Sequence, residues 1–406
     1  MTLPAENCPV CDSPSTSLFL DRPSVPVHQN LLMASPEEAS QIKRGRLAMH
    51  VCSTCGFVFN RAFDDRLMSY NQNYENTQVH SPAFNEYVDQ LVGTVLRDSG
   101  MRGATIVEVG CGKGDFIKRL LRTDPRARGY GFDPSYLGPD VVLDGRLKFE
   151  KRFYDASSAD LKADIVICRH VIEHITRPNE IVRAVRSAVE SNPEAHVFFE
   201  TPSVDWILEN EVTWDFFYEH CSLFTAASLS TLFTRNRFHV ESVRHVFGEQ
   251  YLWLHARPAA VTPQVTLQPG TTPENARRFK DVEARRNRVW RELIQAESAR
   301  GPLVVWGAGA KAVTFANLVD PDHRWIEAIV DVNPSKQGKY LAGSQHPIIA
   351  PDSLSELQPA CVLVLNPNYR DEISQRLSSL GLSTEIIDLM HDGVLSESGQ
   401  LEAPTI

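Results

Sequence analysis

The chain has 406 residues, of which 42% are hydrophobic and 23% charged, an ordinary composition for a globular protein of two or three domains. Its formal net charge of −10 disfavours non-specific binding to nucleic acid or to an anionic membrane. No apolar run reaches the roughly 18 residues of a transmembrane helix, and the first residues lack the basic and apolar segments of a signal peptide. With eight cysteines in such a chain we expect a cytoplasmic protein, in which paired cysteines indicate metal before disulfides.

Two cysteine pairs dominate the first block, residues 1–75. They are C-P-V-C, with Cys8 and Cys11, and C-S-T-C, with Cys52 and Cys55. Structural zinc is most often held by four thiolate or imidazole ligands in a tetrahedron, and two C-x-x-C turns complete such a shell with no position open to substrate. A redox pair is the alternative, but no thioredoxin-like βαβ pattern surrounds either motif. We therefore expect an N-terminal domain with one structural Zn²⁺.

The second block, residues 76–257, alternates apolar strands with amphipathic helices, and residues 104–121 are predicted to form strand, glycine turn and helix. The turn contains three alternate glycines, Gly110, Gly112 and Gly114, which allow a tight bend and the approach of a ligand to the backbone. Asp133 ends the next strand, where an acidic residue reaches ribose hydroxyls in doubly wound sheets. The turn lacks the P-loop pattern, and Glu108 just before it favours a positively charged ligand over a pyrophosphate. Another nucleotide remains the alternative.

This block resembles the class I S-adenosylmethionine-dependent methyltransferases. V-E-V-G-C-G-K-G matches their first motif, and A-D-I-V-I-C-R-H-V-I-E-H-I (163–175) matches their fourth-strand motif. The resemblance implies that the glycines approach the methionine part of the cofactor, that Asp133 binds its ribose and that residues 153–161 flank its adenine. It also places Arg169 and His170, at the end of the fourth strand, beside the cofactor, whereas His174 is expected to be structural.

The whole chain resembles the nucleotide-sugar C-methyltransferases of deoxysugar pathways, which methylate C3 of a 4-keto hexose carried on a nucleoside diphosphate. Besides the cysteine pairs, the marks are Y-E-N (74–76), Y-E-H-C-S-L-F-T (218–225) and G-A-G-A-K-A (307–312). The resemblance implies that Tyr74, together with Tyr70, covers the substrate pocket.

The same resemblance makes His220 the base that forms an enolate, with Glu219 orienting it or contacting the sugar. Such chemistry needs a base with a pKa near 7 and a donor to the enolate oxygen. The family's Tyr-His-Glu-His is here Phe217-Tyr218-Glu219-His220, so its hydroxyl has either moved to Tyr218 or been lost. A core or solvated loop histidine is the alternative for His220.

The third block, residues 258–406, begins with a Pro- and Thr-rich linker and a charged helix, followed by a second strand, glycine turn and helix. Gly307, Gly309 and Ala312 fit G-x-G-x-x-A, which by itself indicates NAD. Lys311 in the turn, near a helix N-terminus, favours a phosphate-bearing ligand. The resemblance makes this a Rossmann-like domain that binds the nucleotide sugar through Gly307, Gly309 and Lys311. A scaffold without ligand is the other alternative.

Together these patterns predict an α/β protein in which a class I methyltransferase core lies between an N-terminal zinc-binding domain and a C-terminal Rossmann-like domain. The expected activity is S-adenosylmethionine-dependent C-methylation of a nucleotide-linked keto-deoxysugar. O- or N-methylation of another natural-product or polysaccharide precursor is the alternative, and a non-catalytic scaffold is a different class altogether. The oligomeric state stays open.

Overall fold

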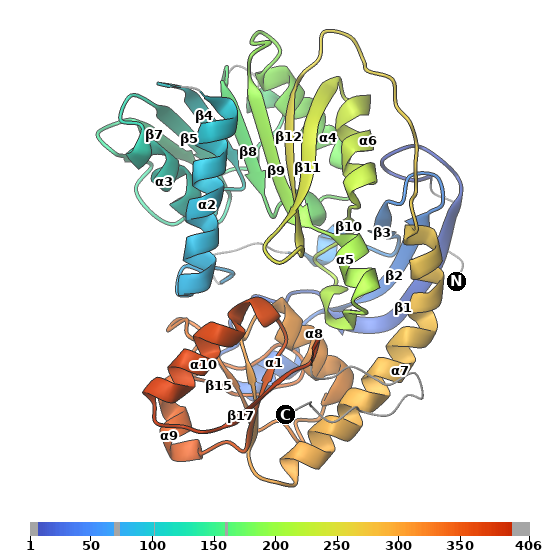
Figure 1. Cartoon of the computed structure of the whole chain (residues 1–406), viewed down its shortest axis with the longest axis vertical. Helices are drawn as coiled ribbons and strands as arrows, with labels where there is room; N and C mark the ends of the chain where they lie inside the picture. The colour runs from blue at the N-terminus through green and yellow to red at the C-terminus, as the bar shows by residue number, and fades with distance from the viewer. Residues whose placement is uncertain (1–6, 69–73, 101, 159–160, 392–406) are drawn as a thin grey trace.

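The computed structural model describes residues 7–68, 74–100, 102–158 and 161–391, and Tyr70 lies outside these ranges. Three β-sheets form the molecule (Figure 1). The largest lies at the top of that view, the C-terminal sheet lies below it, and the N-terminal sheet lies at the right between them. The predicted α/β class is confirmed.

The central sheet has eight strands in the order β11-β12-β9-β8-β4-β5-β7-β6. Neighbouring strands among β9, β8, β4, β5 and β7 are parallel, whereas β12 is antiparallel to both of its neighbours. The strand bounds are β4 (Thr105–Val109), β5 (Arg128–Phe132), β6 (Val141–Val142), β7 (Leu147–Glu150), β8 (Ile165–Arg169), β9 (His196–Pro202), β11 (Phe238–Val246) and β12 (Tyr251–Pro258).

Helices cover both faces of this sheet because successive strand side chains point to opposite sides. On β4, Ile106 packs with α2 (Pro82–Ser99) and α3 (Asp115–Thr123), and its neighbour Val107 packs with α4 (Pro178–Ala188) and α6 (Ala226–Arg235). Because these strands are parallel, their carboxyl ends lie at one edge of the sheet, where α/β proteins bind ligands.

The N-terminal sheet is antiparallel, in the order β1 (Thr16–Pro26), β2 (Arg44–Cys52), β3 (Val58–Asn60) and β10 (Ser222–Leu223). Its last strand comes from the second block of the sequence, and Ser222 pairs with Phe59. The segment that carries His220 is thus attached to the N-terminal sheet. Two short helices also belong to this region, α1 (Pro36–Ser40) and α5 (Val204–Glu209).

The C-terminal sheet has five parallel strands in the order β15-β14-β13-β16-β17. Its elements are β13 (Leu303–Trp306), α8 (Ala310–Val319), β14 (Ala328–Val330), β15 (Ile348–Ile349), α9 (Leu354–Leu357), β16 (Cys361–Val364), α10 (Arg370–Ser379) and β17 (Glu385–Asp388). The long helix α7 (Thr272–Ser298) leads into this sheet and packs its Phe279 against Phe19 of β1, with ring centroids 6.2 Å apart. One core therefore joins the N- and C-terminal units.

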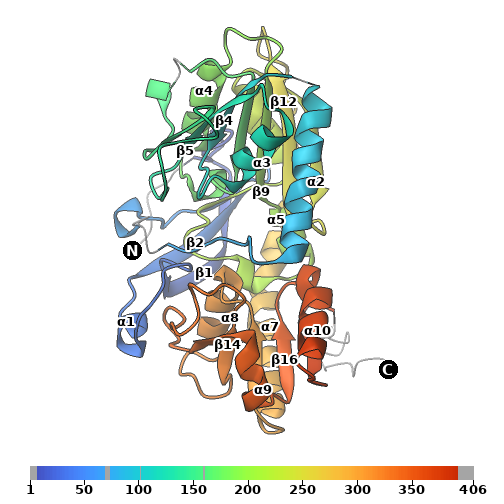
Figure 2. The same cartoon turned by 90° about the vertical axis from the view of Figure 1, so that its left-hand side faces the viewer.

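Short 3₁₀ turns complete the structure: η1 (Asp65–Leu67), η2 (Ala156–Ser158), η3 (Ile172–His174), η4 (Thr213–Asp215), η5 (Pro351–Ser353) and η6 (Pro367–Tyr369). Figure 2 shows the lower end of α2 above α10 of the C-terminal unit. There Glu372 accepts hydrogen bonds from Ser81 Oγ at 2.6 Å and Ala83 N at 3.2 Å, capping α2 from the C-terminal unit. Among the described helices, none combines the length and hydropathy needed to cross a bilayer.

Candidate active site

A cavity of about 620 Å³ opens between the central and C-terminal sheets. It brings together most residues that the sequence singled out, from all three blocks: Tyr74, Glu108, Gly110, Gly112, Asp133, Arg169, His170, Glu219, His220, Gly307, Gly309 and Lys311. Gly114 and Tyr218 are not among its lining residues in the described part of the chain.

The first glycine turn lies at the carboxyl edge of β4. A Cβ on Gly112, where φ is +52°, would meet nothing within 4 Å, so this glycine faces open space. A Cβ on Gly110 would overlap Val171, and one on Gly114 would overlap the Phe149 ring. The structure therefore corrects the expectation that Gly114 approaches the cofactor. Gly114 precedes α3 as its N-cap and allows the chain to pack against Phe149 of β7. Gly112 is the position that leaves room for a ligand.

Two carboxylates flank this turn. Asp133 accepts a hydrogen bond from the Gly112 amide at 2.8 Å, which fixes the turn against the end of β5. Glu108 is buried, and its burial raises the pKa of the carboxyl group to about 8, although the charge of Arg169 opposes that shift. A cationic ligand at this edge would favour the ionised form of Glu108.

Arg169 is engaged with the protein itself. Its Nε donates to Glu200 Oε2 at 2.6 Å, and its guanidinium lies 4.5 Å from the centre of the Phe116 ring. Tyr87 donates to the other oxygen of Glu200. Burial disfavours the charge on Glu200, but Arg169 and His170 outweigh it and lower the pKa of this carboxyl group to about 2. Arg169 therefore lies at the cavity wall as the counter-ion of a buried carboxylate.

His170 is a cation held between two carboxylates. Its Nδ1 lies 3.2 Å from Glu173 Oε1 and its Nε2 lies 3.5 Å from Glu200 Oε2. Burial lowers the pKa of His170, but the two carboxylates outweigh burial and raise it to about 9. An imidazolium of this kind cannot accept a proton near neutral pH, so His170 is unsuited to act as a base.

His220 has the opposite character. Burial lowers its pKa well below the usual value, and the charges of His174, His170 and Lys311 lower it further. The ring is therefore neutral near pH 7 and can accept a proton. Its pKa is lower than the value near 7 expected from the chemistry, so it is a weaker base than expected. His174 packs edge-to-face on it with centroids 5.0 Å apart, so His174 belongs to the cavity wall and the expectation of a purely structural role is corrected.

Glu173, His174 and His220 place their ligand atoms within 4.8 Å of one another, a spacing that could admit a metal ion. Both oxygens of Glu173 are already engaged, one facing His170 Nδ1 and the other accepting from Thr201 Oγ1 at 3.2 Å. We therefore interpret the group as a polar cluster of the wall.

Glu219 lies beside His220, and the N-terminal segment supplies donors to both of its oxygens. His28 Nδ1 is 2.8 Å from Oε1, and the Tyr74 hydroxyl donates to Oε2 at 3.1 Å. Asn30 Nδ2 in turn donates to the Tyr74 oxygen at 3.3 Å. No motif in the sequence marks His28 or Asn30, and the contacts join positions far apart in the chain.

Tyr218 points away from the cavity, which corrects its assignment as a catalytic residue. Its hydroxyl accepts a hydrogen bond from the Asp64 amide at 2.8 Å, and its ring stacks on Phe63 with centroids 5.0 Å apart. Phe217 occupies the position of the family's tyrosine, lines the cavity and lies 4.0 Å from the His220 ring. The hydroxyl at that position is thus lost, and it has not moved to Tyr218.

At the far end of the cavity, Gly307 and Gly309 also face open space, since a Cβ on either would meet nothing within 4 Å. Lys311, in the first turn of α8, is not a free charge. Lys311 Nζ donates to both oxygens of Asp215, at 2.6 Å to Oδ1. Lys336 donates to the Ala308 carbonyl at 2.9 Å. Lys311, the basic group expected at a phosphate site, and the nearby Lys336 therefore already have protein partners.

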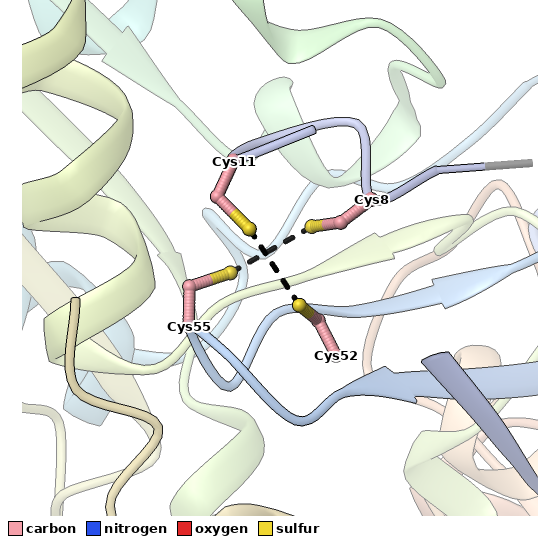
Figure 3. Close-up of side chains that lie close together, drawn as sticks. All are labelled: Cys8, Cys11, Cys52 and Cys55. Carbon is pink, nitrogen blue, oxygen red and sulfur yellow. Dashed lines mark hydrogen bonds between the residues drawn. The ribbon is translucent and has the colours of Figure 1, made fainter. Parts of the chain in front are cut away.

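The four paired cysteines lie together outside this cavity (Figure 3). Cys8 Sγ is 3.6 Å from Cys55 Sγ, and Cys11 Sγ is 3.6 Å from Cys52 Sγ. Sulfur atoms bound to one tetrahedral zinc at about 2.3 Å are about 3.8 Å apart, so the spacing fits that ion. All four thiols are buried and free of disulfides, and Gly56 has the positive φ expected of a knuckle turn.

Two family models match the chain: a methyltransferase domain over residues 83–243 and a C-methyltransferase C-terminal domain over residues 271–385. The first contains the glycine turn, Asp133 and His220, and the second contains the other glycine turn. The chain is an S-adenosylmethionine-dependent methyltransferase. The second match is to a domain that is described as the C-terminal domain of C-methyltransferases.

Among its relatives, this methyltransferase is 26% identical to the C-methyltransferase NovU of Streptomyces niveus over 91% of each chain. It is 27% identical to the ubiquinone biosynthesis O-methyltransferase of Salmonella paratyphi A, over 26% of its own length and 45% of that enzyme. The structure of magnesium protoporphyrin IX methyltransferase from Synechocystis covers 44% of the chain at 18% identity, with a TM-score of 0.35.

Gly112→Val is expected to weaken S-adenosylmethionine binding by about 10- to 100-fold, because the new side chain fills the open space at the turn. Gly145→Val is the matched control, since Gly145 also has a positive φ and open surroundings but lies outside the cavity lining. Calorimetry measures both. Equal affinity in the two variants would show that the cofactor does not approach Gly112.

Proposed function

We propose that this methyltransferase transfers the methyl group to carbon, next to the ketone of a nucleotide-linked keto-deoxysugar. The observation that carries the proposal is His220, a neutral imidazole on the wall of the cavity that extends from the first glycine turn to the second. The similarity to NovU over 91% of the chain supports transfer to carbon.

In this mechanism His220 removes the proton on the carbon beside the ketone. The electrons of that C–H bond form the enolate, and the imidazolium charge is offset by the enolate charge next to it. The Tyr74 hydroxyl, which donates to Glu219 at the cavity wall, is proposed to turn from that carboxylate and donate to the enolate oxygen. S-adenosylmethionine, when bound, would supply the electrophilic methyl group for the enolate carbon and would leave as S-adenosylhomocysteine.

Hydrogen exchange separates carbon methylation from the alternative of O- or N-methylation. The enzyme is incubated in D₂O with S-adenosylhomocysteine and a nucleoside-diphosphate 4-keto hexose, so that no methyl group can be transferred. Exchange of the proton beside the ketone, detected by NMR, is expected only if the enzyme forms the enolate. Methyl transfer to a sugar without any such exchange would indicate that oxygen or nitrogen is the acceptor.

The second glycine turn is proposed to hold the nucleoside diphosphate. The supporting features are the open space at Gly307 and Gly309 and the N-terminus of α8 that follows them. The ion pair between Lys311 and Asp215 requires that a bound phosphate exchange with the Asp215 carboxylate. The two partners should therefore influence binding in opposite directions.

Lys311→Met is expected to weaken the binding of a nucleoside diphosphate by about tenfold or more, the scale of a hydrogen bond to a charged group. Asp215→Asn should tighten binding, because it releases the lysine. Lys148→Met, at an exposed position of β7, is the control. Calorimetry that finds the same affinity in all three variants would remove Lys311 from the site.

For the cysteine cluster we propose a structural Zn²⁺ bound by Cys8, Cys11, Cys52 and Cys55. The 3.6 Å sulfur separations and the buried, unoxidised thiols support this ion. Four protein ligands leave zinc no open coordination position, so the ion has no direct part in methyl transfer.

A further inference from the structure

The N-terminal unit reaches the cavity at a second place besides its sheet, through the residues that follow β1. His28 is 2% exposed and lies outside the cavity lining, whereas Tyr74 and Glu219 line the cavity. His28 Nδ1 lies 2.8 Å from Glu219 Oε1. A residue of the N-terminal unit thus supports the wall next to His220.

A buried carboxylate needs a donor for each oxygen, because an unsatisfied buried polar atom destabilises the folded state. Glu219 is fully buried, so it depends on His28 at one oxygen and on Tyr74 at the other. The Tyr74 hydroxyl proton is directed at Glu219, and its oxygen accepts from Asn30. The position of Glu219 therefore determines where the Tyr74 hydroxyl lies.

We propose that His28 is a positioning residue for methyl transfer. It acts through Glu219, which it holds in place so that the Tyr74 hydroxyl is fixed at the cavity wall beside His220. This inference rests on the proposed function, because it concerns the same reaction. It gives the N-terminal unit a part in the reaction that is separate from zinc binding.

His28→Ala is expected to reduce kcat by about 10- to 100-fold, the scale of a small misplacement of reacting groups, with little change in the affinity for S-adenosylmethionine. His28→Asn should restore most of kcat, because its amide nitrogen is as many bonds from the backbone as Nδ1. His50→Ala is the matched control: His50 is also buried in the N-terminal unit, but it packs on Phe59 and lies outside the cavity lining. An Asn variant as slow as the Ala variant would overturn the proposal.

A double-mutant cycle tests whether His28 acts through Glu219. In the Glu219→Gln background, His28→Ala should cause little further loss of kcat, because the carboxylate that it positions is already gone. Two losses that multiply would show that His28 has an independent role and would overturn the proposal. The unfolding midpoint of each variant is measured in parallel, because a purely structural residue would change the midpoint without this dependence on Glu219.

Crystal structures of His28→Ala and of the wild-type enzyme separate this inference from the proposed substrate. Displacement of the Glu219 and Tyr74 side chains in the variant is expected, whichever acceptor the enzyme uses. Unchanged positions would overturn the inference even if keto sugars are methylated. Displaced side chains in an enzyme that methylates no keto sugar would overturn the proposed substrate and leave the positioning role standing.

Discussion

Replacing His220 with asparagine is expected to reduce methyl transfer by a factor of about 10² to 10⁴, the contribution of a positioned general base. The amide occupies similar space but cannot accept a proton near pH 7. The protonation state of this ring is set by burial and by neighbouring cations, not by hydrogen bonds to charged partners. Its replacement should therefore preserve the fold and the cofactor affinity. Methyl transfer is measured by mass spectrometry, and cofactor affinity by calorimetry.

His239→Asn, at an exposed position of β11, is the control and should leave activity unchanged. His170→Asn offers a contrast, because it removes a cation from between Glu173 and Glu200 and should lower the unfolding midpoint as well. A fully active His220→Asn enzyme would remove His220 from the mechanism. His170 would not be a satisfactory replacement, since its pKa of about 9 keeps it protonated.

The pH dependence of kcat/KM follows from the lowered pKa of His220. A base must be neutral to act, and the pKa of His220 is lowered well below 6.5, so the neutral form persists as the pH falls through 6.5. Activity limited by this group should therefore decline only at a pH well below 6.5. In wild type, an acidic limb centred at 6.5 or above would contradict this assignment.

Removing the metal is expected to have the largest effect on stability. The purified protein should contain about one zinc per chain, and Cys52→Ala should lose the ion and the fold of the N-terminal unit. The free energy of zinc binding in small sites, about 10–16 kcal/mol, equals or exceeds the stability of a typical domain, about 5–15 kcal/mol. Elemental analysis and thermal unfolding measure the two effects.

Loss of zinc should also abolish methyl transfer, because β10 joins the His220 segment to the N-terminal sheet and His28 contacts Glu219. Cys361→Ala is the control: this buried thiol lies in the C-terminal sheet, so the variant should keep one zinc per chain. Zinc-free protein with an unchanged unfolding midpoint would contradict a structural role for the ion.

Local sequence patterns predicted much of the architecture. The strand and the helix predicted around the first glycine turn form β4 and α3, and the fourth-strand motif forms β8. Such elements follow from periodicity and from glycine, which act over a few residues. The cysteine pairs likewise marked their cluster, because the C-x-x-C spacing brings two sulfurs together locally.

Local sequence patterns could not predict which side chains of the site are charged or ion-paired. Lys311 and Asp215 are 96 residues apart, and His28 and Glu219 are 191 residues apart, so only the packing of the three sheets brings them together. That packing pairs a lysine expected to bind phosphate with a carboxylate, and it raises the pKa of His170 so that this ring is protonated. It also leaves His220 neutral.

By itself the sequence determined the glycine turns, the two cysteine pairs and the polar residues next to His220 in the chain, because each depends on neighbours along the chain. The tertiary structure decided that Tyr218 faces Asp64 in the N-terminal unit and that Glu219 faces His28. Adjacent residues of an irregular segment point in directions set by what surrounds them. Desolvation and ion pairing, which fix the protonation of His170 and His220, likewise arise only when distant segments exclude water around them.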